Sequence, residues 1–292
     1  MDLDQSELEI WPSRIADVGG QSVHRALPKH RHRTVGPWCF VDLFGPTDQA
    51  TRIGPHPHIG LHTVTWLFDG EIVHTDSLGT RQPIRPGQLN LMTAGRGVAH
   101  AEQSADSFSG HIHGVQLWVA QPETTRWGDP AFEDHESLPG VVLGRSDATV
   151  LAGSFGGVAS PARTDTPMVG VQANVRASFE APLDPSFEHV VVVAEGSVTI
   201  EDPMTLEPRV VEAYETAYLP LGHDALALSS ESRARILLLG GEPFGAEILM
   251  WWNFVARTWD EMAEARADWV TDSDRFAAVD SALDRIAAPP LG

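Results

Sequence analysis

The sequence predicts an all-β protein made of two similar antiparallel β-barrel domains, with one helix near the end of the chain. Short apolar runs such as "TVTWLFDG", "QLNLMTAG" and "HGVQLWVAQP" end in glycine or proline turns at intervals of roughly 8 to 12 residues, which is typical of sandwiches and barrels. The two halves also resemble each other, because "VTWLFDGEIVHTDSLG" is echoed later by "VVVVAEGSVTIEDPM". Such self-similarity predicts two copies of one β unit.

A polar segment with three prolines separates the two β series. It reads "PETTRWGDPAFEDHESLP" from Pro122 to Pro139, and we expect a linker there. The chain has 292 residues, which is enough for two domains that each bury a core. We therefore expect a first domain over residues 1–135 and a second domain, with the helix, over residues 136–292.

The helix is predicted by "RTWDEMAEARADWV" near the end of the chain. Thr258 and Glu261 have the spacing of a capping box, which marks a helix start. Helical periodicity predicts one apolar face that packs over a sheet. The residues expected on this face are Trp259, Met262, Ala263 and Val270.

Charge and composition exclude several classes of protein. The formal net charge is −20, from 40 acidic and 20 basic residues, and this field would repel a phosphate backbone. We therefore expect no nucleic-acid partner. No apolar run reaches about 18 residues and the first residues lack a signal-peptide pattern, so we expect a cytoplasmic protein without a membrane span. Cys39 is the single cysteine, so any metal must be held by nitrogen and oxygen.

Two short motifs predict a metal site. His56 and His58 in "GPHPHIG" are two residues apart, as are His100 and Glu102 in "GRGVAHAEQS", and strand residues at this spacing share a face. If the two strands are neighbours, three imidazoles and one carboxylate converge. This donor set suits a divalent first-row metal such as iron, manganese, nickel or copper, with zinc as a further option. Four protein ligands leave about two octahedral positions for other molecules.

The other histidines of the first half are open to several interpretations. His62 would share the face of His56 and His58 if the strand ran unbroken past Gly60. It would then be a fifth ligand, a proton shuttle or a second-shell donor, the last being the functional role we favour, or else a buried structural residue. Structural or pocket-lining roles are expected for His74, His111 and His113.

Four segments of the sequence resemble the pirin family of the cupin superfamily: "PHPHIGLHTVTWLFDGEIVHTDSLG", "IRPGQLNLMTAGRGVAHAE", "HGVQLWV" and "PFGAEILMWWNFVARTWDEMAEARADW". The resemblance implies two antiparallel cupin or jelly-roll barrels that face each other, with metal in the N-terminal one alone. It also implies iron(II) as the metal. The pirin ligand positions fall on the residues that the spacing predicts, namely His56, His58, His100 and Glu102. The second barrel, with only His189 and His223, is expected to be metal-free and structural.

The resemblance further implies an activity. Some family members look like quercetinases, which use O₂ to open the central ring of a flavonol, so we expect a metal-dependent dioxygenase acting on a small aromatic substrate. Glu102 would accept the proton of the flavonol 3-hydroxyl or help to hold the metal. An alternative is an iron-dependent redox-sensing regulator that binds a transcription factor or a metabolic enzyme, with the basic stretch from His24 to Arg33 as a candidate surface. A metal-dependent isomerase or lyase is a third option. The ligands alone do not separate these options.

Overall fold

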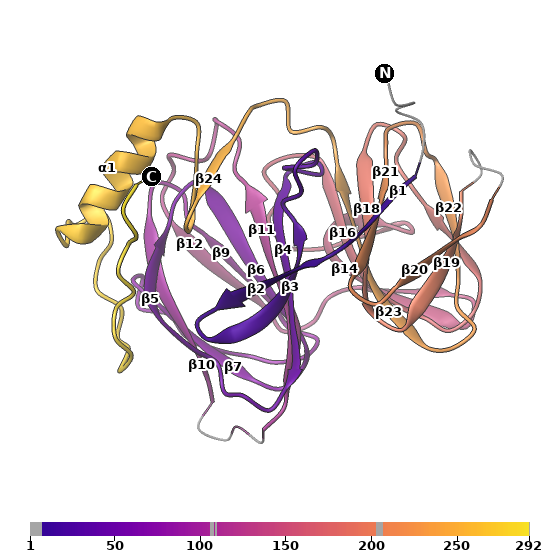
Figure 1. The fold of residues 1–292 in the computed structure, drawn as a ribbon, viewed down its shortest axis with the longest axis horizontal. Helices are drawn as coiled ribbons and strands as arrows, with labels where there is room; N and C mark the ends of the chain where they lie inside the picture. The colour runs from indigo at the N-terminus through magenta and orange to yellow at the C-terminus, as the bar shows by residue number, and fades with distance from the viewer. Residues whose placement is uncertain (1–7, 106–107, 109, 203–206, 292) are drawn as a thin grey trace. The chain divides into compact units, whose positions relative to one another are not determined.

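The computed structural model describes residues 8–105, 108, 110–202 and 207–291, which form β-strands with one helix near the C-terminus (Figure 1). The described residues confirm the predicted all-β class with a C-terminal helix. The chain divides into two compact units. One contains the described parts of Met1–Ala16, His24–Leu43 and Ser137–Phe244, and the other contains those of Asp17–Val23, Phe44–Glu136 and Gly245–Gly292. We call these the distal unit and the histidine unit, respectively.

Two antiparallel sheets form the main part of the histidine unit. The division between the units falls within β2, β3 and β4, which end the larger sheet. In spatial order the larger sheet contains β12 (Ala131–His135), β9 (Leu89–Thr93), β6 (Leu61–Asp69), β11 (Ile112–Ala120), β4 (Trp38–Thr47), β3 (Gln21–Leu27) and β2 (Arg14–Val18). The smaller sheet contains β5 (Arg52–His58), β10 (Val98–Ser104), β7 (Ile72–Asp76) and β8 (Arg81–Ile84).

The two sheets of the histidine unit share an apolar core. Leu67 and Ile112 from the larger sheet pack with Ile72 and Ile84 from the smaller one, and each of these side chains is at most 2% exposed. Several strands of this unit are buried at nearly every position, among them β6, β9 and β11, so both of their faces are covered. In the figure the strands of this unit run in the indigo to magenta part of the chain (Figure 1).

The C-terminal segment also belongs to the histidine unit. It forms the hairpin of β24 (Leu249–Trp251) and β25 (Phe254–Ala256), followed by α1 (Trp259–Val270). A second core joins this segment to the strands of the site. Its buried members include Ile59, Ala99, Phe254, Met262 and Trp269.

The helix confirms the predicted start but corrects the predicted face. Thr258 is the N-cap, and its hydroxyl accepts a hydrogen bond from the Glu261 main-chain N–H at 3.2 Å. The buried face contains Met262, Ala265 and Trp269, whereas Trp259 and Val270 are 55% and 53% exposed. The expected stripe was therefore wrong in all but Met262. The helix turns its small Ala265 and its Trp269 toward the core, so the apolar residues at its two ends point to solvent.

The distal unit repeats the two-sheet plan. Its larger sheet contains β1 (Glu9–Pro12), β21 (Glu215–Leu219), β18 (Glu188–Glu195), β23 (Ala234–Gly241), β16 (Met168–Val175), β14 (Ser146–Phe155) and β13 (Gly140–Leu143), with β15 (Val158–Ala159) paired to β14. Its smaller sheet contains β17 (Phe179–Pro182), β22 (Ala225–Ser229), β19 (Ser197–Glu201) and β20 (Arg209–Glu212). One core of valine, leucine and isoleucine side chains from both sheets fills this unit.

The segment predicted as a linker includes a strand of the larger sheet of the histidine unit. The segment expected as a linker contains β12, whose residues pair with Leu89–Thr93 in the sheet. Each compact unit also contains a segment from the opposite end of the chain. The C-terminal helix belongs to the histidine unit, and the first strand belongs to the distal unit with the second β series. The division at residues 135 and 136 therefore stays a prediction about domains. Within the part of the chain that the structure describes, no helix combines the length and the apolar character needed to cross a membrane.

Candidate metal centre

Neighbouring strands bring the two predicted motifs together. β5 and β10 pair in antiparallel register, so that His56 lies opposite His100. The register shifts next to this pair, because Glu102 lies opposite Ile53. The step from His100 to Glu102 is two residues on β10, whereas the matching step from His56 to Ile53 is three residues on β5. A β-bulge of this kind accepts proline, which cannot donate to a ladder, and Pro55 lies within it.

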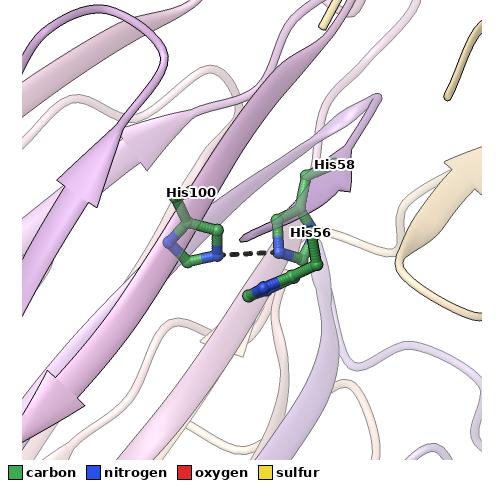
Figure 2. Close-up of side chains that lie close together, drawn as sticks. All are labelled: His56, His58 and His100. Atoms are coloured by element: carbon green, nitrogen blue, oxygen red, sulfur yellow. Dashed lines mark hydrogen bonds between the residues drawn. The ribbon is translucent and has the colours of Figure 1, made fainter. Parts of the chain in front are cut away.

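Three imidazole rings converge at this point. His56, His58 and His100 each offer one nitrogen within 4.8 Å of the others. The Nε2 atoms of His58 and His100 are 3.1 Å apart, and the ring of His56 lies beside both (Figure 2). All three side chains are buried, with exposures of 7%, 1% and 1%. The structure therefore assembles the three histidines that the spacing predicted.

The Nδ1 atoms of two of these rings face main-chain oxygens. His56 Nδ1 lies 2.9 Å from the Gly54 carbonyl, and His58 Nδ1 lies 2.9 Å from the Asn253 carbonyl. A carbonyl oxygen can only accept, so each Nδ1 must carry the proton and donate it. In the neutral ring this leaves the Nε2 lone pair free, which is the form that binds a metal.

The third ring is held by a chain of two further side chains. His100 Nδ1 lies 3.2 Å from His74 Nδ1, and His74 Nε2 lies 3.1 Å from Asp76 Oδ2. The other oxygen, Asp76 Oδ1, accepts the main-chain N–H groups of Leu78 and Thr80, both at 2.9 Å. The Asp76 carboxylate accepts a hydrogen bond from His74 Nε2–H, so a neutral His74 accepts a hydrogen bond at Nδ1 from His100. His100 then also presents a bare Nε2 to the cluster.

Burial keeps the three rings neutral. Desolvation lowers the pKa of His56 to about 4 and outweighs the hydrogen bond to the Gly54 carbonyl, which alone would raise it. Desolvation, reinforced by the neighbouring histidines, also lowers the pKa of His58 and His100 well below the ordinary value. For Asp76, burial alone would raise the pKa, but hydrogen bonds from His74 and Thr80 outweigh it and lower the pKa. The cluster is thus uncharged next to an ionised carboxylate.

Glu102 does not share a group of candidate ligands with His56 and His58. Its carboxylate forms a second group with His74 and His100, whose offered atoms lie within 4.8 Å of one another. It is 6% exposed, and the Thr65 hydroxyl donates to Oε1 at 3.2 Å. Desolvation raises the pKa of Glu102, an effect that the nearby His74 and the Thr65 hydrogen bond reduce. His100 therefore links Glu102 to the three-histidine group.

The strand does not run unbroken to His62, so the condition for a shared face is not met. β5 ends at His58, and Gly60 adopts a φ of +67° before β6 begins at Leu61. His62 is buried, and its Nδ1 lies 2.9 Å from the Thr93 hydroxyl. Among the described residues, His62 belongs to neither group of candidate ligands. A second-shell role for His62 stays a prediction.

The second H-x-H pair of the first half does not share one face. β11 begins at Ile112, so His111 precedes the strand and lies 3.0 Å from the Asp69 carboxylate, with its side chain 52% exposed. His113 is buried and packs edge-on against Phe68. These positions fit the structural role expected for both residues.

Sequence reasoning missed the part that His74 plays at the site. The segment "HTD" places His74 and Asp76 two residues apart on β7, which is the same spacing as His100 and Glu102, so a signal was present. Two aromatic contacts were also missed. Phe132 of β12 stacks on His74 at 4.7 Å, and Trp118 meets His58 edge-on at 5.2 Å between ring centroids.

The residues at the site fit a divalent metal. Two Nε2 lone pairs that face each other at 3.1 Å repel unless a proton or a cation lies between them, and the low pKa values of both rings oppose the proton. Three neutral imidazoles and a nearby carboxylate are donors that first-row divalent metals accept. The donor types alone do not select one metal.

The fold and the buried cluster define a class of protein: a cupin-type chain of two β units, one of which holds a histidine-rich centre. Two family models match this chain, "Pirin" over residues 20–119 and "Pirin C-terminal cupin domain" over residues 168–276. The chain belongs to the pirin family, as its sequence motifs predicted.

Named relatives cover almost the whole chain. A Pseudomonas aeruginosa protein named "Putative quercetin 2,3-dioxygenase" is 42% identical over 97% of this chain and 90% of its own length. A "Pirin-like protein" of Caulobacter vibrioides is 35% identical over 89% of this chain and 92% of its own length. The crystal structure of a quercetin 2,3-dioxygenase from Acinetobacter baumannii matches with a TM-score of 0.91 and 39% identity, covering 98% of this chain and 96% of that one.

Proposed function

We propose that this protein is a mononuclear metal dioxygenase that opens flavonols of the quercetin type with O₂. The observation that carries the proposal is the convergence of His56, His58 and His100, each with its Nδ1 engaged elsewhere and its Nε2 available. The names of the similar proteins from Pseudomonas and Acinetobacter support the choice of substrate. The chemistry of the donors supports the choice of a metal.

In this proposal the three histidines and Glu102 hold the metal, with iron(II) preferred and manganese, nickel, copper or zinc as alternatives. A divalent metal bound there would supply Lewis-acid chemistry and, for iron, manganese, nickel or copper, redox chemistry toward O₂. The neutral rings need not lose a proton before they bind, because burial already lowers the pKa of all three.

Glu102 is the proposed catalytic residue. Its buried carboxylate has a raised pKa, so it is a stronger base than an exposed glutamate and suits removal of the proton from a flavonol 3-hydroxyl. The Thr65 hydroxyl, which lies 3.2 Å from Glu102 and 3.0 Å from Gln116, orients the carboxylate. The buried surroundings keep bulk water from competing for that proton.

The first test compares the wild type with His58→Ala and with His111→Ala as a matched control. His111 is an exposed histidine of the same unit that lies outside the cluster. We expect about one metal ion per chain in the wild type and the control, and a loss of affinity of more than about 100-fold in His58→Ala. Metal content is measured by elemental analysis, and O₂ uptake is measured with quercetin.

Two outcomes would contradict parts of the proposal. Metal bound at full occupancy without O₂ uptake on quercetin would exclude the dioxygenase and favour the redox-sensing regulator. Equal metal content in His58→Ala and the control would exclude the site itself. Glu102→Gln separates the roles of the carboxylate: retained metal with lost O₂ uptake indicates a base, whereas lost metal indicates a ligand.

A further inference from the structure

A cavity of about 290 Å³ is lined by residues of the distal unit alone, none of which belongs to the candidate metal centre. Its rim includes the exposed residues Ser154, Thr164 and Asp184. Its wall is polar and apolar in about equal parts and comes from β14, β16, β18, β23, the end of β17 with the segment after it, and the segment before β16. The apolar wall residues are Phe155, Met168, Val169, Leu183, Phe187 and Leu238.

The cavity also contains a histidine whose polar atoms lack partners. His189 on β18 is 0% exposed and lines the cavity. Neither of its ring nitrogens has a partner at good hydrogen-bond geometry among the described residues, although the Phe187 main chain lies near enough to raise the pKa of the ring. The buried Oγ1 of Thr166, another lining residue, also lacks a partner there. Buried polar groups are nearly always hydrogen-bonded, so two unpaired ones at one cavity indicate a missing partner.

The other buried histidine of the distal unit shows the usual arrangement. His223 Nδ1 lies 2.8 Å from the Pro220 carbonyl, and its Nε2 lies 3.3 Å from Asp202 Oδ2. Both nitrogens of His223 are thus satisfied by the protein, although His223 is as deeply buried as His189. The two rings differ in that His189 lines the cavity, where there is room for a partner, whereas His223 does not.

The missing partner is a neutral group. Burial lowers the pKa of His189 to about 4, and the nearby His223 adds to this effect, whereas Asp184 and the Phe187 main chain oppose it. A neutral imidazole offers one donor and one acceptor, which matches a hydroxyl group. The described lining residues include no lysine or arginine, and the net charge of −20 also disfavours an anion.

We propose that this cavity binds small neutral phenols, with the hydroxyl on His189 and Thr166 and the ring against the apolar lining residues, which include Phe155 and Phe187. An apolar protein cavity of about 150 Å³ holds one benzene molecule, so 290 Å³ accommodates one substituted ring or two small ones. The flat aromatic walls favour a ring over a flexible chain. This site is separate from the proposed metal centre and does not depend on its activity.

The test titrates the full-length protein with phenol and with toluene, which has the same ring without the hydroxyl. Binding is followed by calorimetry and by the NMR signals of the His189 ring. We expect phenol to bind at least about tenfold more tightly than toluene, because toluene leaves the buried imidazole unpaired. His189→Leu should abolish this preference, and His30→Gln, which changes an exposed histidine of the same unit, should retain it.

A second variant keeps the test decisive if His189→Leu fails to fold. Thr164→Trp places a large ring at the exposed rim without altering the core, and it should weaken phenol binding at least about tenfold by closing the entrance. Equal affinity for phenol and toluene in the wild type would overturn the proposal and indicate a water-filled cavity. Tighter binding of benzoate or benzylamine than of phenol would overturn the neutral class, and unchanged binding in Thr164→Trp would overturn the location.

Discussion

Asp76 acts on the candidate metal centre through two histidine rings. Its Oδ1 is occupied by two main-chain N–H groups, so its Oδ2 is the oxygen available to His74. His74 donates from Nε2 to Asp76, so its Nδ1 accepts a hydrogen bond from His100 Nδ1–H. His100 therefore has its proton on Nδ1, and its Nε2 is unprotonated. Outer-shell partners of this kind set the tautomer and orientation of a ligand and raise its basicity.

This relay predicts that His74→Phe weakens metal binding without removing any of the four proposed ligands. Phenylalanine keeps the ring that stacks on Phe132, but it has no nitrogen to accept from His100. We expect metal affinity to fall roughly 10- to 100-fold, the usual cost of losing an outer-shell partner. Competition with a metal chelator measures the change.

His62→Phe is the matched control for this experiment. It also replaces a buried histidine of the same unit with a ring of similar size, but the Nδ1 of His62 lies beside the Thr93 hydroxyl and not beside His100. Metal affinity close to that of the wild type in His62→Phe, beside a loss in His74→Phe, would assign the outer-shell role to His74. The reverse result would support the role that the sequence suggested for His62.

The sequence predicted the site well where strand periodicity applies and poorly where it does not. The spacing of two predicted that His56, His58 and His100 converge, and they do so because β5 and β10 are neighbours and His56 lies opposite His100. Glu102 lies beyond a shift in the register and belongs to a separate group of candidate ligands. The same spacing rule predicted that His62 shares a strand face with His56 and His58, but Gly60 turns the chain between β5 and β6. The contribution of His74 depends on which strand pairs with β10, and sequence spacing does not contain that information.

At the scale of elements, one tight turn positions the histidine strand against the C-terminal hairpin. Gly60 has a φ of +67°, and a Cβ at this position would lie 2.2 Å from the Val255 carbonyl oxygen of β25. The neighbouring Ile59 carbonyl accepts a hydrogen bond from the Val255 N–H at 3.1 Å. This turn therefore requires glycine for both its backbone conformation and its close approach.

Gly60→Ala is expected to destabilise the protein by about 2 kcal/mol or more, because it combines left-handed strain with a backbone clash. This corresponds to a fall in the midpoint of thermal unfolding of roughly 5 °C. Gly79→Ala is the matched control, since Gly79 has a φ of +89° but no atom within 4 Å of its added Cβ. Similar losses in the two variants would show that the close approach to Val255 contributes nothing.

The type of each element could be predicted better than its environment. The capping spacing of Thr258 and Glu261 predicted the helix start, because a cap depends on local sequence. The buried face could not be assigned in the same way, since it depends on the core formed by Ile59, Ala99 and Phe254, which is distant in the sequence. For the same reason the polar residues of β12 suggested a linker, although they form an edge strand.

At the scale of the whole molecule, a buried neutral histidine makes stability depend on pH. The pKa of His189 is lowered from 6.5 to about 4 by burial, with His223 reinforcing the shift and Asp184 opposing it. The unfolded chain therefore takes up this proton first as the pH falls. The stability that depends on the neutral ring is complete above pH 6.5 and is lost between pH 6.5 and pH 4.

His189→Gln should reduce this acid sensitivity. Between pH 7 and pH 5 the His189 ring accounts for a loss on the order of 2 kcal/mol, which the variant lacks because glutamine does not titrate. Chemical denaturation at the two pH values measures the difference for the wild type, for His189→Gln and for the exposed control His30→Gln. An equal loss in all three proteins would mean that His189 does not contribute to acid sensitivity.

The exchange of chain ends between the two units has a consequence for biosynthesis. The ribosome adds Asn253, whose carbonyl orients His58, almost two hundred residues after His58 itself. The buried core residues Phe254, Met262 and Trp269 follow later still. The nascent histidine unit therefore leaves the ribosome with one of its rings unoriented and a patch of core exposed until the last segment arrives. A premature stop codon before this segment would affect the distal unit least, yet it would remove the carbonyl that orients a histidine encoded almost two hundred codons earlier.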